Sequence, residues 1–123
     1  MSGVSEMKAK IVLCLLLAAI TPASHATVVF VNASVVRTLV ADEDRFGGCM
    51  AKLDKVLASF GLDCPGTWVS FSCSGTFTPK DNAYRMFDSA QMALALGKTV
   101  AVQVDDTKKH NGNCYARRID VLR

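Results

Sequence analysis

The pattern of apolar and polar positions divides residues 27–123 into short segments separated by polar turns. Residues 27–40 are rich in valine and threonine, and such β-branched side chains favour a pleated, half-buried surface. They predict a long first strand, followed by a polar turn over residues 42–48. Residues 49–57 alternate at first and predict a second strand, although the part over residues 55–60 also fits a helical turn.

The clearest strand signal covers residues 68–77, after a loop over residues 61–66 that proline and glycine punctuate. Every second residue from Val69 to Cys73 is apolar, and this period of two predicts one face directed at the core. Trp68 belongs to the opposite set, so we expect its ring on the outer face, at a rim or a partner surface.

A helix is predicted next. Thr78 is the expected N-cap, Pro79 suits the first helical position, and Gly97 is the expected C-cap glycine. The apolar residues that recur at helical spacing between these ends are Ala83, Met86, Phe87, Ala90 and Leu94.

Two further strands are predicted after the helix, over residues 98–104 and 115–122, with a polar loop over residues 105–113 between them. The order is three strands, one helix and two strands. The predicted fold class is therefore mainly β with one helix: an OB-like five-stranded barrel with its helix between strands 3 and 4. An open α+β sheet packed on the helix is the structural alternative.

Residues 1–26 have the order of a secretory signal. Two lysines precede an unbroken apolar run over residues 11–20, and small residues at Ser24 and Ala26 occupy the positions that a signal peptidase reads. The run has about half the roughly 20 residues that a spanning helix needs. We expect cleavage after Ala26, leaving one secreted or periplasmic domain, residues 27–123, without a stable membrane span. The alternatives are an uncleaved anchor, a buried core helix and a lipoprotein anchor at Cys14, which is disfavoured because Cys14 lies inside the apolar run.

The cysteines of residues 27–123 are Cys49, Cys64, Cys73 and Cys114. An even number in a small exported chain predicts two disulfides, for which three connectivities exist. If residues 48–56 and 67–77 form a hairpin, Cys49 falls opposite Cys73, which leaves Cys64 for Cys114. The alternative, a four-thiolate zinc site, is disfavoured because no two cysteines have the two-residue spacing typical of such sites.

The sequence offers little catalytic chemistry. His110 is the only histidine of residues 27–123, and it lies among lysines and asparagines, which is no setting for a nucleophile–base pair. Asp105 and Asp106 are neighbours, whose side chains point to opposite faces of a strand, so we expect solvated loop carboxylates rather than metal ligands. We expect no enzyme, no cofactor and no metal.

The formal net charge of the chain is only +3, and no block of like charges suggests a nucleic-acid partner. Aromatic side chains that could stack on a sugar or pack on a protein are Trp68, Tyr84 and Tyr115. Each is also a candidate for ordinary core or rim packing.

Several segments resemble a family of small, uncharacterised exported bacterial proteins. The segments that carry this resemblance are residues 47–53, 68–73, 84–91 and 105–112, together with Cys114. They cover most of the region after the signal, but the family implies little about activity.

The chain is also similar to the receptor-binding B subunits of bacterial one-A-five-B toxins, of the subtilase cytotoxin type. The shared features are the element order, the size, the disulfides and the late helix before a valine-rich strand. Those subunits are exported OB-like barrels that form pentameric rings and bind host glycans. The resemblance implies a non-catalytic, homo-oligomeric glycan-binding module, but no sugar-contact motif carries over. The alternative function is a structural or accessory envelope protein, such as an inhibitor or assembly factor with one protein partner.

Overall fold

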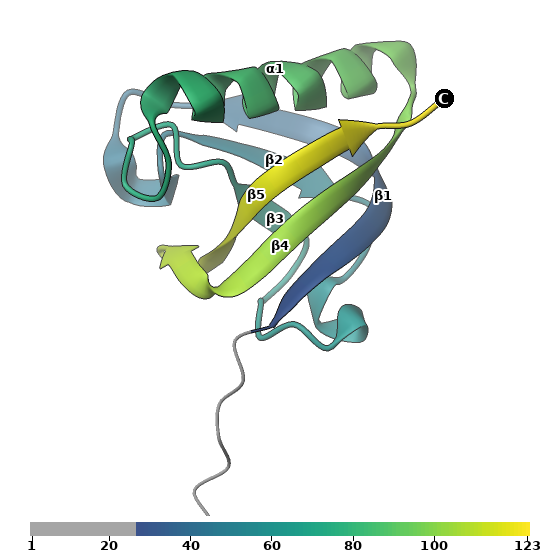
Figure 1. Ribbon diagram of the computed structural model, residues 1–123, viewed down its shortest axis with the longest axis horizontal. Helices are drawn as coiled ribbons and strands as arrows, with labels where there is room; N and C mark the ends of the chain where they lie inside the picture. The colour runs from purple at the N-terminus through teal and green to yellow at the C-terminus, as the bar shows by residue number, and fades with distance from the viewer. Residues whose placement is uncertain (1–26) are drawn as a thin grey trace, which may run out of the picture.

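Five strands close into a barrel in the computed structural model, which describes residues 27–123 (Figure 1). The strands are β1 (Val28–Val40), β2 (Cys49–Leu53), β3 (Trp68–Ser70), β4 (Thr99–His110) and β5 (Asn113–Val121). Their order around the barrel is β1-β2-β3-β5-β4, and every neighbouring pair is antiparallel except β3 and β5. The helix α1 (Lys80–Leu96) connects β3 to β4. The predicted five-stranded barrel with its helix between strands 3 and 4 is confirmed, whereas the predicted signal lies outside the described residues.

Strand β1 closes the barrel because it pairs along both of its edges. Its first half pairs with β4, from Val28 opposite Asp105 to Ser34 opposite Thr99, and its second half pairs with β2. The register shifts after Val35, which is the kind of irregularity that bends a strand from one sheet partner to the next. Its valine-rich pattern predicted the strand, and alternate side chains up to the bend are buried in the barrel.

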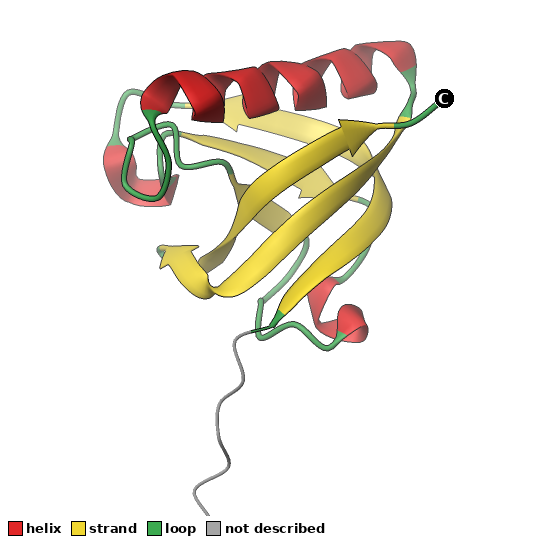
Figure 2. Cartoon of the chain, in the orientation of Figure 1, coloured by secondary structure: helices red, strands yellow, loops and turns green. Residues whose placement is uncertain are grey.

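Helix α1 lies across one end of the barrel and covers the core (Figure 2). Its buried residues are Ala83, Phe87, Ala90 and Ala93, and the ring of Phe87 packs on that of Phe71 with centroids 6.3 Å apart. Gly97 ends the helix with φ 64°, as expected of a C-cap glycine. The prediction for the other end was wrong by one position: Pro79 is the N-cap, because it keeps an extended ψ of 141°, and Lys80 is the first helical residue.

Three predicted boundaries are corrected by the structure. Strand β3 stops at Ser70 rather than continuing to residue 77, because the chain turns at Ser72, which adopts φ 61°. Strand β2 stops at Leu53, and the 3-10 helix η2 (Leu57–Phe60) follows, in agreement with the helical-turn alternative. Strand β4 continues to His110 through the segment expected to be a polar loop.

Two disulfides join the loops to the barrel. Cys49 at the start of β2 is bonded to Cys73, and Cys64 is bonded to Cys114 in β5. This is the connectivity that the hairpin argument favoured, and it excludes a zinc site made of these four thiolates. Within residues 27–123 no helix has the length and apolar character required to cross a membrane.

Candidate functional site

A small apolar hollow opens on the outer face of the barrel, and we call it the Trp68 cleft. It has a volume of about 220 Å³ and is lined by Leu39, Phe46, Met50, Trp68 and Asn113. This volume lies below the roughly 300–1,000 Å³ of pockets that take drug-sized molecules, and it suits a single ring-sized group.

The strand register explains how the floor of the Trp68 cleft forms. Leu39 pairs with Met50 across β1 and β2, and Lys52 pairs with Trp68 across β2 and β3. Side chains two residues apart share a face, so Met50 and Lys52 both lie on the outer face of the strand, next to Trp68, where Met50 is buried and Lys52 is half-buried. The inward residue between them, Ala51, is fully buried in the core.

Two connections form the sides of the Trp68 cleft. Phe46 comes from the short 3-10 helix η1 (Asp44–Phe46) in the β1–β2 connection, and its carbonyl oxygen accepts a hydrogen bond of 2.7 Å from the Ser70 hydroxyl. Asn113 is the first residue of β5, after the β4–β5 turn, and its amide donates to the His110 carbonyl at 3.3 Å. In OB-fold barrels this region, the face of strands 2 and 3 between these two connections, is where oligosaccharides and oligonucleotides bind.

Cations lie at the rim of the Trp68 cleft. The guanidinium carbon of Arg37 is 5.8 Å from the centre of the Trp68 ring, within cation–π range. Arg45 lies similarly over Phe46 at 5.9 Å. Lys52 is half-buried beside the tryptophan. The cleft therefore combines an apolar floor with hydrogen-bond donors at its edge, an arrangement that suits a ligand with one apolar face and polar edges.

The structure does not bring the three aromatic candidates together. Trp68 is half-buried and lines the cleft, whereas Tyr84 is 44% exposed on the outer side of α1. Tyr115 is 5% exposed, and its ring packs on Phe77 with centroids 5.4 Å apart. Tyr115 therefore serves the core in this structure, and Phe46 and Asn113 are the cleft residues that the sequence did not single out.

A serine–histidine pair lies behind the Trp68 cleft and corrects the expectation for His110. The histidine ends β4, and its Nε2 atom lies 2.9 Å from the Ser72 Oγ atom, so it does have a hydroxyl partner. The same hydroxyl oxygen accepts the Phe77 backbone N–H at 3.0 Å. The ring of Phe77 also packs on the imidazole, with centroids 4.6 Å apart.

The two members of this pair differ in burial, because Ser72 is buried and His110 is half-buried. Ser72 is 0% exposed, and Gly47 packs so closely that a Cβ atom there would lie 2.5 Å from the imidazole Cδ2 atom. Burial lowers the pKa of His110 below its ordinary 6.5, and the charge of Asp44 opposes part of this shift. The contact holds the turn after β3 against the end of β4.

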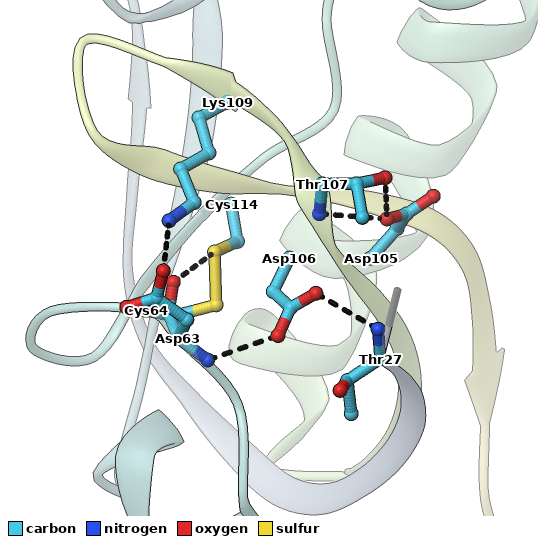
Figure 3. Close-up of polar contacts among 8 residues, drawn as sticks. All are labelled: Thr27, Asp63, Cys64, Asp105, Asp106, Thr107, Lys109 and Cys114. Carbon is cyan, nitrogen blue, oxygen red and sulfur yellow. Dashed lines mark hydrogen bonds and ion pairs between the residues drawn. A yellow bond between two sulfur atoms is a disulfide. The ribbon is translucent and has the colours of Figure 1, made fainter. Parts of the chain in front are cut away.

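The acidic neighbours of β4 are also engaged within the fold (Figure 3). Asp105 is buried and accepts hydrogen bonds from the backbone N–H and the hydroxyl of Thr107, at 2.9 and 2.6 Å. Asp106 accepts the backbone N–H groups of Thr27 and Asp63, at 2.9 and 3.0 Å. The expected solvated loop carboxylates are thus structural acceptors. Across residues 27–123 no group of three or more metal-ligating side chains is clustered for an ion.

Comparison with known proteins identified no relative. No family model matches the chain, and no curated protein or solved structure matches it at a significant level.

Proposed function

We propose that the protein is a secreted or periplasmic, non-catalytic binding module that binds a glycan at the Trp68 cleft. The observation that carries the proposal is the place of this cleft: an apolar hollow with an accessible tryptophan lies on the face that OB-fold barrels use for ligands. Two disulfides in so small a domain support an oxidising compartment outside the cytoplasm.

The chemistry of the cleft favours a sugar ring. A pyranose has an apolar face of C–H groups, which packs on an aromatic ring, and hydroxyl groups at its edge, which need hydrogen-bond partners. Trp68 supplies the ring, Arg37 supplies donors beside it, and the side-chain oxygen of Asn113 supplies an acceptor, because the Asn113 amide nitrogen already donates to backbone carbonyls. The volume of about 220 Å³ leaves room for one sugar unit, with the rest of a chain extending over the rim.

A glycan array probed with the folded, disulfide-bonded protein tests this proposal, followed by titration calorimetry with any glycan that binds. Trp68→Ala is expected to weaken binding at least about tenfold, because central aromatic residues contribute most to such contacts. Tyr84→Ala removes an exposed aromatic outside the cleft and is the matched control, expected to leave the affinity unchanged.

Absence of binding across a broad array by a folded sample would contradict the glycan proposal. So would equal losses in the two variants. The alternative function, an envelope inhibitor or assembly factor, predicts instead that the protein binds one protein partner stoichiometrically. No glycan should compete with this partner, and Trp68→Ala should abolish its binding.

A further inference from the structure

A second hollow lies between helix α1 and the outer surface of β4 and β5, and we call it the arginine groove. Its volume is about 490 Å³, and its lining is Thr78, Asn82, Arg85, Met86, Gln103, Arg117 and Arg118. Three of these side chains are cationic and none is acidic. The remaining lining includes one hydroxyl and two amide side chains, so the groove is positively charged and carries further hydrogen-bonding groups.

A strand irregularity places two consecutive arginines in this groove. Gln103 of β4 pairs with Arg118, but Val104 pairs with Ala116, so Arg117 is an extra residue in β5. In a regular strand one of two neighbouring side chains would point into the barrel, where an unpaired guanidinium is very costly. The bulge lets both arginines remain exposed on the same side.

The charges of the arginine groove are only partly neutralised. Arg118 is bonded to Asp120 through two contacts of 2.9 and 3.1 Å, and its guanidinium carbon lies 5.4 Å from the centre of the Phe30 ring. In the described part of the chain, neither Arg85 nor Arg117 has an ion pair or a side-chain hydrogen bond. Two guanidinium groups without anionic partners therefore line one hollow.

We propose that the arginine groove binds a sulfate or phosphate group through Arg85 and Arg117. The planar guanidinium presents a fork of donors that matches such an oxyanion, and charge-assisted bonds of this kind are about twice as strong as neutral ones. The hydroxyl of Thr78 and the amides of Asn82 and Gln103 supply further donors at the same surface. The site is separate from the Trp68 cleft, so it stands whether or not that cleft binds a glycan.

Calorimetry and NMR of the arginine side chains test this site, with inorganic sulfate, inorganic phosphate and a heparin-derived oligosaccharide as probes. The double variant Arg85→Gln with Arg117→Gln is expected to weaken binding at least about tenfold. Lys55→Gln with Lys98→Gln is the control, because it removes the same charge from exposed positions outside the groove. The affinity of this control variant is expected to stay within about twofold of the wild-type affinity.

Saturable binding of the inorganic ions would support a site for the free anion. Binding of the oligosaccharide alone, lost in the arginine variant, would support a site for an anionic glycan. Equal losses in the two double variants would overturn the proposal, because they would show attraction by net charge only. No binding of any probe would overturn it as well. The single variant Arg117→Gln repeats the test if the double variant unfolds.

A different observation concerns the beginning of β1. The backbone nitrogen of Thr27 lies 2.9 Å from the Asp106 Oδ1 atom (Figure 3). The Asp106 backbone N–H in turn donates to the Thr27 carbonyl at 3.1 Å. The other carboxylate oxygen accepts the backbone N–H of Asp63 at 3.0 Å, next to the disulfide of Cys64. Asp106 thus joins the start of β1 to the loop before β3.

Cleavage after Ala26 would change the charge of this contact. Hydrolysis of the Ala26–Thr27 peptide bond consumes one water: Ala26 keeps the new carboxylate, and Thr27 gains an amino group that takes up a proton. We infer that this new ammonium group forms an ion pair with Asp106, so that export processing itself strengthens the closure of the barrel. The inference rests on the predicted cleavage site.

The test compares the exported, processed protein with a form that retains Ala26 as its first residue. Mass spectrometry first verifies that the processed chain begins at Thr27. Asp106→Asn is then expected to lower the Tm of the processed form by about 4 °C more than that of the extended form. Asp120→Asn is the control. Asp120 pairs with Arg118, so this substitution should lower the Tm of both forms equally.

An equal effect of Asp106→Asn in the two forms would overturn the inference. A processed chain that begins at another residue would overturn it too. Neither result bears on the Trp68 cleft, because glycan binding is measured separately on the wild-type protein.

Discussion

The Nε2 atom of His110 lies 2.9 Å from the Oγ atom of Ser72, across a sequence separation of 38 residues. This contact joins the end of β4 to the turn that follows β3. It lies beside Gly47, which belongs to the connection that forms one side of the Trp68 cleft. The contact between Ser72 and the half-buried His110 therefore adjoins one side of the cleft.

Replacing Ser72 with alanine should destabilise the protein by about 1–3 kcal/mol. The change leaves the Phe77 backbone N–H and the buried side of His110 without their partner, and an unsatisfied buried polar group costs this much. Urea unfolding measures the loss. Ser89→Ala is the matched control, because Ser89 bonds only to the Arg85 carbonyl of its own helix. Equal losses for the two variants would contradict the structural role of Ser72.

The stability of the protein should fall as the pH drops below about 6.5. Burial lowers the pKa of His110 in the folded state, so the unfolded chain takes up a proton first. The full stability is present above the unfolded pKa of 6.5 and declines until the folded imidazole also becomes protonated. Urea unfolding at that pKa, and at pH values about one unit above and below it, would follow this decline.

Substitution His110→Gln should flatten this pH dependence, because His110 is the only histidine of residues 27–123. The carboxylate of Asp106 does not contribute to this pH dependence. Burial raises its pKa, but the bonds from Asp63 and Thr27 and the charge of Lys109 outweigh that effect and bring it below 3.8. A decline of the same size in the His110→Gln variant would contradict the assignment.

The barrel was predictable because its signals are local or nearly so. The valine-rich run of β1 and the helical spacing of Ala83 and Phe87 each reflect one element. The assumed pairing of the second and third strands favoured the bond between Cys49 and Cys73 that the structure has, although β3 itself ends at Ser70. The far half of β4 was missed because its residues from Asp105 to His110 are polar. Their strand conformation comes from pairing with β1 and β5 and from bonds such as that of Asp106 to Thr27.

The candidate site was only partly predictable for the same physical reason. The period of two placed Trp68 on the outer face, where the structure has it. The other lining residues, Leu39, Phe46 and Asn113, lie beside that tryptophan only because the barrel closes. No local sequence pattern predicts a contact between residues so far apart in the chain. The bulge that keeps Arg117 and Arg118 on one side is likewise a property of the pairing of β4 with β5.

Replacing Gly47 with alanine should destabilise the protein more than the same change at Gly61. Both residues have a left-handed φ, 74° and 78°, so both substitutions carry a similar conformational cost of about 1 kcal/mol. At Gly47 the new Cβ would also lie 2.5 Å from the His110 ring and the Ser70 hydroxyl, whereas nothing lies within 4 Å at Gly61. The difference, expected to be about 1–3 kcal/mol, is read from urea unfolding. Identical losses would show that the contact with His110 is not tight.

Removal of the two disulfides should have unequal effects. The bond between Cys64 and Cys114 closes a sequence separation of 50 residues, and that between Cys49 and Cys73 closes one of 24. A cross-link that closes a longer loop removes more entropy from the unfolded chain, by about 0.6 kcal/mol for each doubling of length. Replacing each pair with alanines should therefore lower the free energy of unfolding by about 3–4 kcal/mol, with the larger loss for the longer loop.

Guanidinium unfolding of the two double variants, with the protein that has both disulfides as reference, measures both losses. A larger loss for the shorter loop would show that packing of Cys49 and Cys73 in the core, rather than chain entropy, decides the order.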